Sequence, residues 1–252
     1  MAEPAQTSGK PAKETQVSAD VHHTGTVESF HDNGSVSERT HLKDGLPEGE
    51  SQSFSPKGGL TRSARFREGV LDGEMRIYDE DGELFQKAAY AAGELDGRML
   101  LYTEGRLVAM LNYVKGVRDG EFVISSELGD LSMRMIYRQG KPHGEALYYY
   151  PSGNLAKRAK YVLGLLEGEA TEYDEKGGVL ERAFYRKGRL EGERRRYHPN
   201  GKLKEVAVFK EGKLAEAVEE YDESGNLKAP VGADGKPAQS RISTFLEKLV
   251  KG

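Results

Sequence analysis

The chain of 252 residues contains no cysteine and no tryptophan, and it has no run of 18 or more apolar residues. Without cysteine it can form neither a disulfide nor a thiolate site, and this absence is compatible with both cytosol and periplasm. The missing apolar run excludes a helical membrane span. The N-terminus also lacks the basic-then-apolar pattern of a signal peptide. We therefore expect a cytoplasmic protein for the chain as given, or a periplasmic one if a signal has been removed.

Apolar residues are too few for a thick globular core. Only 37% of the residues are hydrophobic and 31% are charged, whereas glycine occurs 31 times and tyrosine 13 times. This composition favours an extended structure in which each segment packs against its neighbours. The formal net charge of −4 is too small to indicate a polyanionic partner, so we expect no nucleic acid ligand.

Glycines recur along the chain at a nearly constant spacing. Steps of 24 residues, with one of 23, separate Gly45, Gly69, Gly93, Gly116, Gly140, Gly164, Gly188 and Gly212. A second glycine lies four residues after each of the first seven, and it is usually followed by a glutamate: Glu50, Glu74, Glu121, Glu145, Glu169 and Glu193. A period of this length indicates one supersecondary unit per repeat.

Two series of aromatic residues follow the same period. The first comprises Phe54, Tyr78, Tyr102, Tyr149, Tyr173, Tyr197 and Tyr221, and the second Phe66, Tyr90, Tyr113, Tyr137, Tyr161, Tyr185 and Phe209. We expect them to stabilise a sheet through cross-strand contacts, at about 0.2–1 kcal/mol per pair. An aromatic platform that stacks sugars or bases is the alternative.

Turn signals between the aromatic positions predict hairpins. Asp81-Gly82, Ser152-Gly153, Asn200-Gly201 and Ser224-Gly225 favour type I′ turns, in which both central residues have positive φ. Helical periodicity is absent from the repeats. The fold class is therefore all-β, an elongated antiparallel β-hairpin repeat sheet of about sixteen short strands.

The repeats divide the chain into four parts. The array is expected over 23–228, after a disordered tail over 1–22 that is rich in Ala, Pro, Ser and Thr. A Gly/Pro linker over 229–239 leads to 240–252, where apolar residues at helical spacing predict a short amphipathic helix. We expect this C-terminal helix to cap the last strand of the sheet.

The segment GLLEGEATEYDEKGGVLERAFYRKG, from Gly164 to Gly188, resembles the variant MORN repeat of bacterial YwqK-type antitoxin proteins. The resemblance extends over the whole array, although the tryptophan of the eukaryotic MORN pattern is missing. It implies a MORN-like sheet, and it implies a protein partner of the kind found in toxin–antitoxin or effector–immunity pairs.

Strand register predicts what each face of the sheet carries. A loop at Asp81-Gly82 pairs Ile77 with Gln86, Met75 with Ala88 and Gly73 with Tyr90. Repeated through every unit, this register produces a face that is apolar in the middle of the array and charged toward its C-terminal end. Two explanations remain open, because the sheet could coil and pack this face internally or leave it open to a partner.

Candidate binding residues lie where the repeat departs from its own pattern. Methionine is flexible and polarizable, and five of the six methionines lie in the units between Gly69 and Gly140. There Arg98 also replaces the usual glutamate. Farther along, the run Arg194-Arg195-Arg196 is costly unless it meets an acidic partner or is simply solvated. The candidates are Met75, Ile77, Arg98, Met99, Leu101, Met110, Phe122, Met133, Met135, Arg194, Arg195 and Arg196.

No pattern of residues indicates catalysis. A glutamate repeated in six units suits a sheet-edge position that holds a backbone or side-chain partner, because catalysis needs one or two carboxylates in unlike environments. Four of the six histidines lie within the first 41 residues, at spacings that match no zinc motif. We therefore expect no enzymatic activity, no metal and no cofactor.

Three functions remain as hypotheses. The leading one is an antitoxin or immunity protein that sequesters a cognate toxin or effector through its sheet. The alternative is a peripheral membrane or scaffold module that binds anionic lipid through Arg194 to Arg196 and the terminal helix. A carbohydrate-active enzyme using the aromatic series is the weakest. The oligomeric state is left open.

Overall fold

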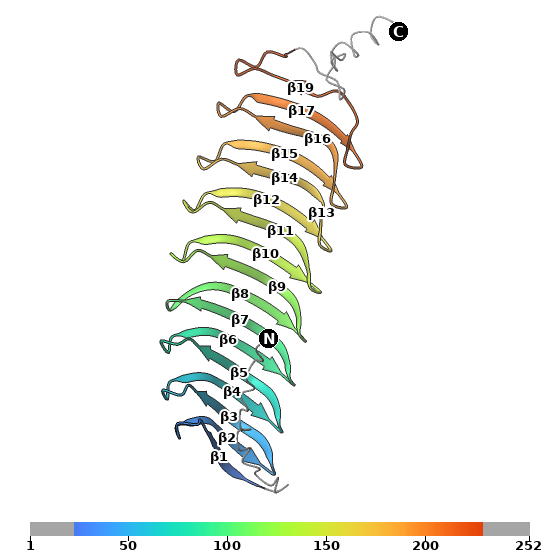
Figure 1. Cartoon of the computed structure of the whole chain (residues 1–252). Helices are drawn as coiled ribbons and strands as arrows, with labels where there is room; N and C mark the ends of the chain where they lie inside the picture. The colour runs from blue at the N-terminus through green and yellow to red at the C-terminus, as the bar shows by residue number, and fades with distance from the viewer. Residues whose placement is uncertain (1–22, 229–252) are drawn as a thin grey trace, which may run out of the picture.

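The computed structural model describes residues 23–228, which form a single antiparallel sheet of nineteen strands (Figure 1). The first nine strands are β1 (Gly25–Phe30), β2 (Val36–Lys43), β3 (Leu46–Phe54), β4 (Leu60–Arg67), β5 (Val70–Tyr78), β6 (Leu84–Ala91), β7 (Glu94–Thr103), β8 (Arg106–Val114) and β9 (Val117–Ser125). The others are β10 (Leu131–Arg138), β11 (Lys141–Tyr149), β12 (Leu155–Val162), β13 (Leu165–Leu166), β14 (Gly168–Tyr173), β15 (Val179–Arg186), β16 (Arg189–Tyr197), β17 (Leu203–Lys210), β18 (Lys213–Leu214) and β19 (Glu219–Glu220).

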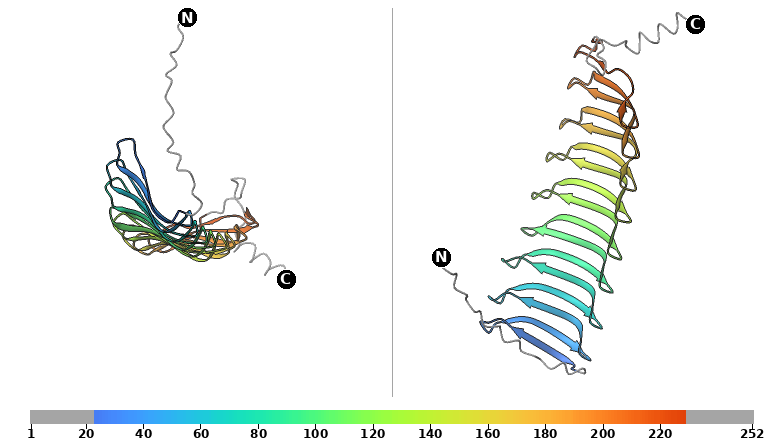
Figure 2. Two further views of the ribbon diagram at one scale, coloured as in Figure 1. Left: turned by 90° about the horizontal axis from the view of Figure 1, so that it is seen from below. Right: turned by 45° about the vertical axis from the view of Figure 1, so that its right-hand side comes forward.

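The hairpins are stacked in chain order, which confirms the all-β, elongated hairpin-repeat architecture (Figure 1). Seen along its length in Figure 2, the sheet is bent into a trough. The tail over 1–22, the linker and the expected C-terminal helix over 240–252 lie outside the described residues. Within 23–228 no helix is long and apolar enough to span a bilayer.

The regularly spaced glycines occupy tight turns at one long edge of the sheet. At each of the eight positions the glycine and the residue before it both have positive φ, as in Lys115 (φ 47°) and Gly116 (φ 73°). Val114 and Val117 pair directly across this turn. These two-residue loops have the backbone of type I′ turns, which matches the twist of the flanking strands.

The turns at the opposite edge differ from the prediction. At Asp81-Gly82 only the glycine has positive φ, so the predicted type I′ turn is wrong there, and the same holds at Gly153, Gly201 and Gly225. The loop is wider because Asp79 N donates to Glu83 O and the Asp79 carboxylate accepts from the N–H groups of Asp81 and Glu83. A β-bulge at Ile77/Tyr78 accommodates the wider loop without changing the register of the strands beyond it. The predicted pairs Ile77–Gln86, Met75–Ala88 and Gly73–Tyr90 are therefore confirmed.

One loop at this second edge is shorter than its neighbours. Glu104 and Gly105 both have positive φ, and Thr103 pairs directly with Arg106. This is the unit in which the glycine spacing falls to 23 residues. The missing residue therefore converts a wide loop into a type I′ turn and leaves the strands in register.

Each tight turn is bonded to the unit before it. Gly93 N donates to Leu71 O. The glycine of each of the remaining turns at this edge makes the equivalent hydrogen bond, and all of these bonds measure 2.7–2.9 Å. Carboxylates add a second bond in five units, where the side chains of Glu48, Asp72, Asp119, Glu167 and Glu191 accept the N–H of the residue before the next turn glycine. The side chain after one turn glycine also covers the next, since a Cβ at Gly93 would lie 3.3 Å from Val70 Cγ1.

A continuous row of buried and half-buried residues, most often alanine, crosses the middle of the strands. The row runs through Ser51, Ala64, Met75, Ala88, Met99, Leu111, Phe122, Met135, Ala146 and Ala159, and continues through Ala170, Ala183, Arg194 and Ala207. Its alanines are at most 6% exposed although no second layer covers them within 23–228. Their larger neighbours on the same face must therefore cover them. We call this face the alanine face.

The opposite face carries the repeated glutamates and is called the glutamate face. These glutamates lie in the interior of the sheet, so the expected edge position is wrong. The expected side-chain partners are confirmed, because cross-strand neighbours engage the carboxylates, as Arg134 does Glu121. Alternation along each strand separates the two faces.

The second aromatic series stabilises the sheet differently from expectation. Each of its members pairs across the strands with the second glycine of a unit, as Tyr90 does with Gly73 and Tyr161 with Gly144. Series members lie on every second strand, about 9–10 Å apart, which is too far for ring stacking. Phe122–Tyr137 is the one ring pair in contact within 23–228, with centroids 5.7 Å apart. Each member of the series therefore lies opposite a residue without a side chain, and not opposite another ring.

The tight turns predict a specific cost for losing a glycine. A Cβ at Gly116 would meet no atom within 4 Å, so Gly116→Ala tests the φ of 73° alone. We expect a loss of about 1–2 kcal/mol in the free energy of unfolding, measured by urea denaturation. Lys115→Ala is the matched control, because Ala92 already occupies that position with φ 49°. Equal stability of the two variants would contradict the assignment of this turn.

Candidate protein-binding surface

The apolar part of the alanine face lies in the middle of the array, over β5 to β11. Beside the central row runs a second row, which contains Ile77, Gln86, Leu101, Ala109, Ile124, Met133 and Tyr148. Seven of the predicted binding residues come together in these two rows: Met75, Ile77, Met99, Leu101, Phe122, Met133 and Met135. We call this group the apolar patch.

The apolar patch is partly exposed. Met135 is buried at 6% exposure, whereas the other six residues of the patch are half-buried. No other segment of 23–228 packs against the patch, because these residues form one sheet without a second layer. Within the described part of the chain, the face is therefore left open to solvent and is not packed internally.

Two predicted residues lie on the opposite face. Arg98 pairs with Asn112, and Met110 pairs with Leu100 on one side and Val123 on the other. Because side chains alternate along a strand, all five belong to the glutamate face. Arg98 and Met110 therefore cannot bind the same partner surface as the apolar patch without a partner that wraps around the sheet.

The arginine run is neutralised within the sheet. Arg194 and Arg196 share the alanine face, where Arg194 pairs with Glu205 and Arg196 Nε lies 2.9 Å from Glu181 Oε2. Arg195 lies on the glutamate face and pairs with Glu193. Of the two explanations for this run, an acidic partner is not required to offset its charge, because each guanidinium has a carboxylate within the sheet. The run, in β16, is also five strand spacings away from β10, about 24 Å.

A row of charged residues continues the second row toward the C-terminus. It contains Lys157, Glu172, Glu181, Arg196, Glu205 and Glu220. Lys157 Nζ lies 2.8 Å from Glu172 Oε1. Burial is the largest single influence on the pKa of Lys157 and lowers it. The hydrogen bond and charge of Glu172, together with Tyr185 and Tyr161, outweigh burial, so the pKa is raised. The predicted change from an apolar to a charged face is present.

Tyrosines separate the apolar patch from the charged row. Burial raises the pKa of Tyr148 well above its ordinary value, and the hydroxyl of Tyr161 adds to the shift. Burial likewise raises the pKa of Tyr185, with a contribution from the charge of Glu181. Arg118 lies over the rings of Phe122 and Tyr137, at 5.7 and 5.6 Å from their centroids. Aromatic and charged groups therefore meet at this border without forming a deep cavity.

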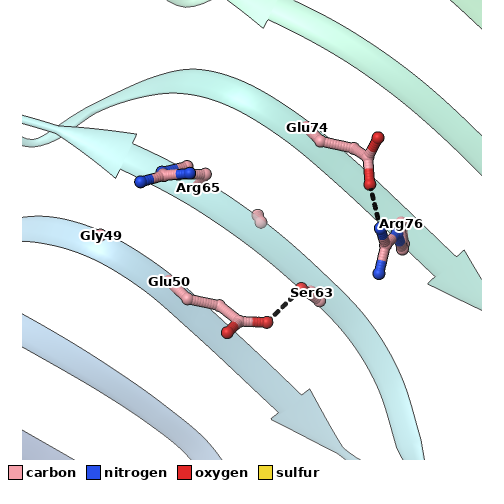
Figure 3. A pocket seen from close by; sticks show the side chains of 7 residues that line it. Gly49, Glu50, Ser63, Arg65, Glu74 and Arg76 are labelled. Carbon is pink, nitrogen blue, oxygen red and sulfur yellow. Dashed lines mark hydrogen bonds and ion pairs between the residues drawn. The ribbon is translucent and has the colours of Figure 1, made fainter.

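The glutamate face has a shallow hollow near the N-terminal end, shown in Figure 3. Ser63 Oγ donates to Glu50 Oε1 at 2.7 Å, and Glu74 pairs with both Arg76 and Lys87. The hydrogen bond from Lys87 lowers the pKa of Glu74, and the charge of Arg76 contributes. Glu74 is therefore neutralised by two basic neighbours, whereas Glu50 accepts a hydrogen bond from an uncharged hydroxyl. Within 23–228 no group of three or more His, Asp or Glu residues is arranged to hold a metal ion.

The repeat can now be compared with known proteins. Four segments match the MORN repeat variant: 71–92, 142–162, 166–187 and 190–211. Each matched segment covers one hairpin with a wide loop, and the MORN repeat variant indicates a repeat-based binding module. The hairpins β7/β8 and β9/β10, which carry most of the apolar patch, lie between the matched segments.

Two further comparisons contribute little. No curated protein is significantly similar to this chain. Crystal structures of TcdB2-TccC3-Cdc42 and TcdB2-TccC3 are similar over 84% of this chain, with 10% identity and TM-scores of 0.21 and 0.22. This chain spans 13% of each of those chains. The MORN repeat variant match therefore stands as the informative likeness.

Sequence reasoning missed the residues that anchor the tight turns. An acidic residue three positions after the turn glycine recurs at Glu48, Asp72, Asp96, Asp119, Glu167 and Glu191. This period was available in the sequence and would have revealed the contact between successive turns. The turn Val162–Leu165, which is wholly apolar apart from its glycine, was also missed.

Neutralisation of the arginine run predicts unequal costs for removing two carboxylates. The Arg194 and Glu205 side chains are 20% and 17% exposed, whereas those of Arg158 and Glu145 are 56% and 54% exposed. We expect Glu205→Gln to lose about 1–3 kcal/mol in urea denaturation, because it leaves partly buried arginines without their carboxylate. Glu145→Gln is the control, at about 0.5 kcal/mol or less. A larger loss from Glu145→Gln would refute the internal pairing.

The tyrosine border predicts a loss of stability at alkaline pH. Tyr148 has a folded pKa above the unfolded value of about 10, so its contribution is present below pH 10 and is lost as the pH rises toward the folded pKa. We expect the Tm of Tyr148→Phe to fall less than that of the unmodified protein between pH 9 and pH 11.5. Tyr149→Phe is the neighbouring control. Parallel Tm curves for Tyr148→Phe and the unmodified protein would contradict the buried hydroxyl.

Proposed function

We propose that this chain is a protein-binding repeat module that acts as an antitoxin or immunity protein, sequestering a cognate toxin or effector. The observation that supports it best is the apolar patch, a group of half-buried hydrophobic side chains on a sheet face without a second layer in the described residues. Contiguous apolar surface of this kind, bordered by polar residues, is typical of protein interfaces.

The composition of the apolar patch suits an adaptable contact. Four methionines lie in it, and their flexible thioether side chains fill irregular gaps in a partner surface. The strands beneath are held in register by backbone pairing on both sides, so binding requires side chains to reorient while the backbone stays fixed. The charged row beside the patch would set the orientation of the partner.

The antitoxin role itself derives from the resemblance of the repeat to the variant MORN repeat of YwqK-type proteins. The match of four segments to the MORN repeat variant supports the repeat class and a binding module. We propose binding without catalysis, because the carboxylates of both faces are spent on ion pairs such as Glu74–Lys87 and Glu172–Lys157. The lipid-binding alternative loses its original support, since Arg194, Arg195 and Arg196 are paired internally.

The proposal predicts that substituting lysine for either of two adjacent leucines has different effects on partner binding. Leu101 lies in the apolar patch and Leu100 lies on the glutamate face, and both are half-buried. The second row of the alanine face already holds Arg62 and Lys157, so Leu101→Lys is compatible with the sheet. We expect Leu101→Lys to weaken the partner complex about 10-fold or more and Leu100→Lys to leave it unchanged.

The partner for this test is the toxin or effector encoded beside the gene for this chain. Its affinity for each purified variant would be measured by isothermal titration calorimetry, and protection by growth of cells that produce the toxin. Circular dichroism of both variants would verify the sheet. The antitoxin role would be contradicted if toxin-producing cells grew equally well without this chain and the purified chain did not bind the neighbouring gene product.

A further inference from the structure

The turns at the tight-turn edge change character along the array. The last four turns are Arg138–Lys141, Val162–Leu165, Arg186–Arg189 and Lys210–Lys213, and we call them the basic edge. They contain seven Lys or Arg residues and one acid, Glu211. The first four turns of the same edge contain three basic and three acidic residues. Positive charge is therefore concentrated at one half of this edge.

The cations of the basic edge have no internal partners. Arg138, Lys141, Arg186, Lys187, Arg189, Lys210 and Lys213 are all exposed, and none forms an ion pair within residues 23–228. Two carboxylates of the neighbouring strands, those of Glu167 and Glu191, accept the backbone N–H groups of Lys187 and Glu211 at 2.8 Å and, among the described residues, form no ion pair with the edge cations. This distinguishes the basic edge from the arginine run at 194–196.

An apolar tip projects from the middle of the basic edge. Val162, Leu163 and Leu165 are 37%, 56% and 49% exposed. Leu163 has φ 51°, a conformation that is uncommon for a bulky side chain, and the other turns of this edge have Asp, Glu, Ala, Lys or Gln at the same position. Folding alone would favour one of those residues. Leu163 therefore meets a requirement that the turn itself does not impose.

The hairpin that carries the tip departs from the repeat in two further ways. His143 replaces the carboxylate that caps the next turn in five other units, and its Nδ1 is buried without a hydrogen-bond partner in the described part of the chain. The strand after the tip is divided into β13 and β14 at Glu167, whose N–H donates to Lys160 O at 2.9 Å. The hairpin therefore keeps its backbone pairing to β12, although its turn lacks the capping carboxylate.

We propose that the basic edge is a second contact surface, which takes an acidic surface of the partner protein with a small apolar pocket for Leu163 and Leu165. This inference rests on the proposed function in that it requires a protein partner. The four turns lie about 29 Å from first to last, a span suited to one side of a standard interface. Arginine, which the basic edge holds at Arg138, Arg186 and Arg189, is enriched among binding hot spots.

The distribution of charge along the chain and the small apolar area of the tip favour a protein partner over a lipid bilayer. The basic edge carries a formal charge of +6, so the rest of the chain carries −10 and would be repelled by an anionic membrane. The apolar tip offers only three side chains, whereas membrane anchoring by one lipid chain is already marginal. A compact acidic protein can contact the edge without approaching the acidic remainder.

The test begins with cross-linking in cells of the source organism. Full-length chains carry p-benzoylphenylalanine in place of Leu163, or in place of Glu68, the equivalent residue of the second turn, or in place of Leu101 in the apolar patch. We expect one protein to be cross-linked from position 163 and not from position 68. A phospholipid adduct from 163, or the same adducts from 163 and 68, would overturn the inference.

The cross-linked protein is then purified and titrated by calorimetry against designed variants. Leu163→Glu with Leu165→Glu uses residues that other turns already hold at these positions, as Glu68 and Glu94 do. We expect this pair to weaken binding about 10-fold or more. Lys187→Glu with Arg189→Glu is expected to weaken binding similarly and to reduce its dependence on salt between about 50 and 300 mM.

Val70→Glu is the matched control, because Val70 occupies the place of Leu165 in the second turn. We expect its affinity to equal that of the unmodified protein. Binding that is lost with Leu101→Lys but unchanged in both edge variants would overturn the basic edge and preserve the proposed function. Absence of any protein adduct from positions 101 and 163 would overturn both.

Discussion

The whole structure depends on backbone pairing between each hairpin and the next. Every strand from β2 to β17 donates and accepts hydrogen bonds on both sides, and the tight turns extend this pairing to the edge through contacts such as Gly93 N to Leu71 O. Pairing on both sides is what allows a sheet with alanine at its centre, rather than large apolar side chains, to remain folded. Neither face of the sheet therefore has to form a thick apolar core. The side chains on them can instead be polar, aromatic or apolar according to position.

Glycine is required in this design for two separate reasons. At the tight turns it supplies positive φ, as Gly116 does, and the small surface over which the preceding unit packs. In the strands, the second glycine of each unit lies opposite an aromatic ring, as Gly73 lies opposite Tyr90. A Cβ at Gly73 would lie 3.0 Å from the Arg65 side chain, so glycine leaves room here for a neighbour on the glutamate face. The aromatic and glycine positions pair across the strands, although they are about 17 residues apart in the chain.

Much of the fold could be predicted from the period of the glycines. The hairpins, the register around Met75 and the division into two faces follow from alternation and from the 24-residue step. Loop geometry could not be predicted in the same way, because a pair such as Asp81-Gly82 or Ser152-Gly153 is compatible with both a two-residue and a wider loop. The wider loop forms at both places, although only the first has an aspartate that caps it. The apolar patch was predicted as a set of residues. Neutralisation of Arg194 to Arg196 was not, because it depends on carboxylates of neighbouring strands, Glu181 and Glu205.

The contacts between successive turns also shape how such an array can change over generations. Since each hairpin bonds only to the one before and the one after, duplication or loss of a whole unit leaves the remaining pairings intact. The single missing residue at Glu104-Gly105 shows that even a smaller change can be confined to one loop. The distance from the apolar patch to the last turn of the basic edge is thus set by a whole number of hairpins. An inherited change in copy number would alter that distance in steps of one hairpin.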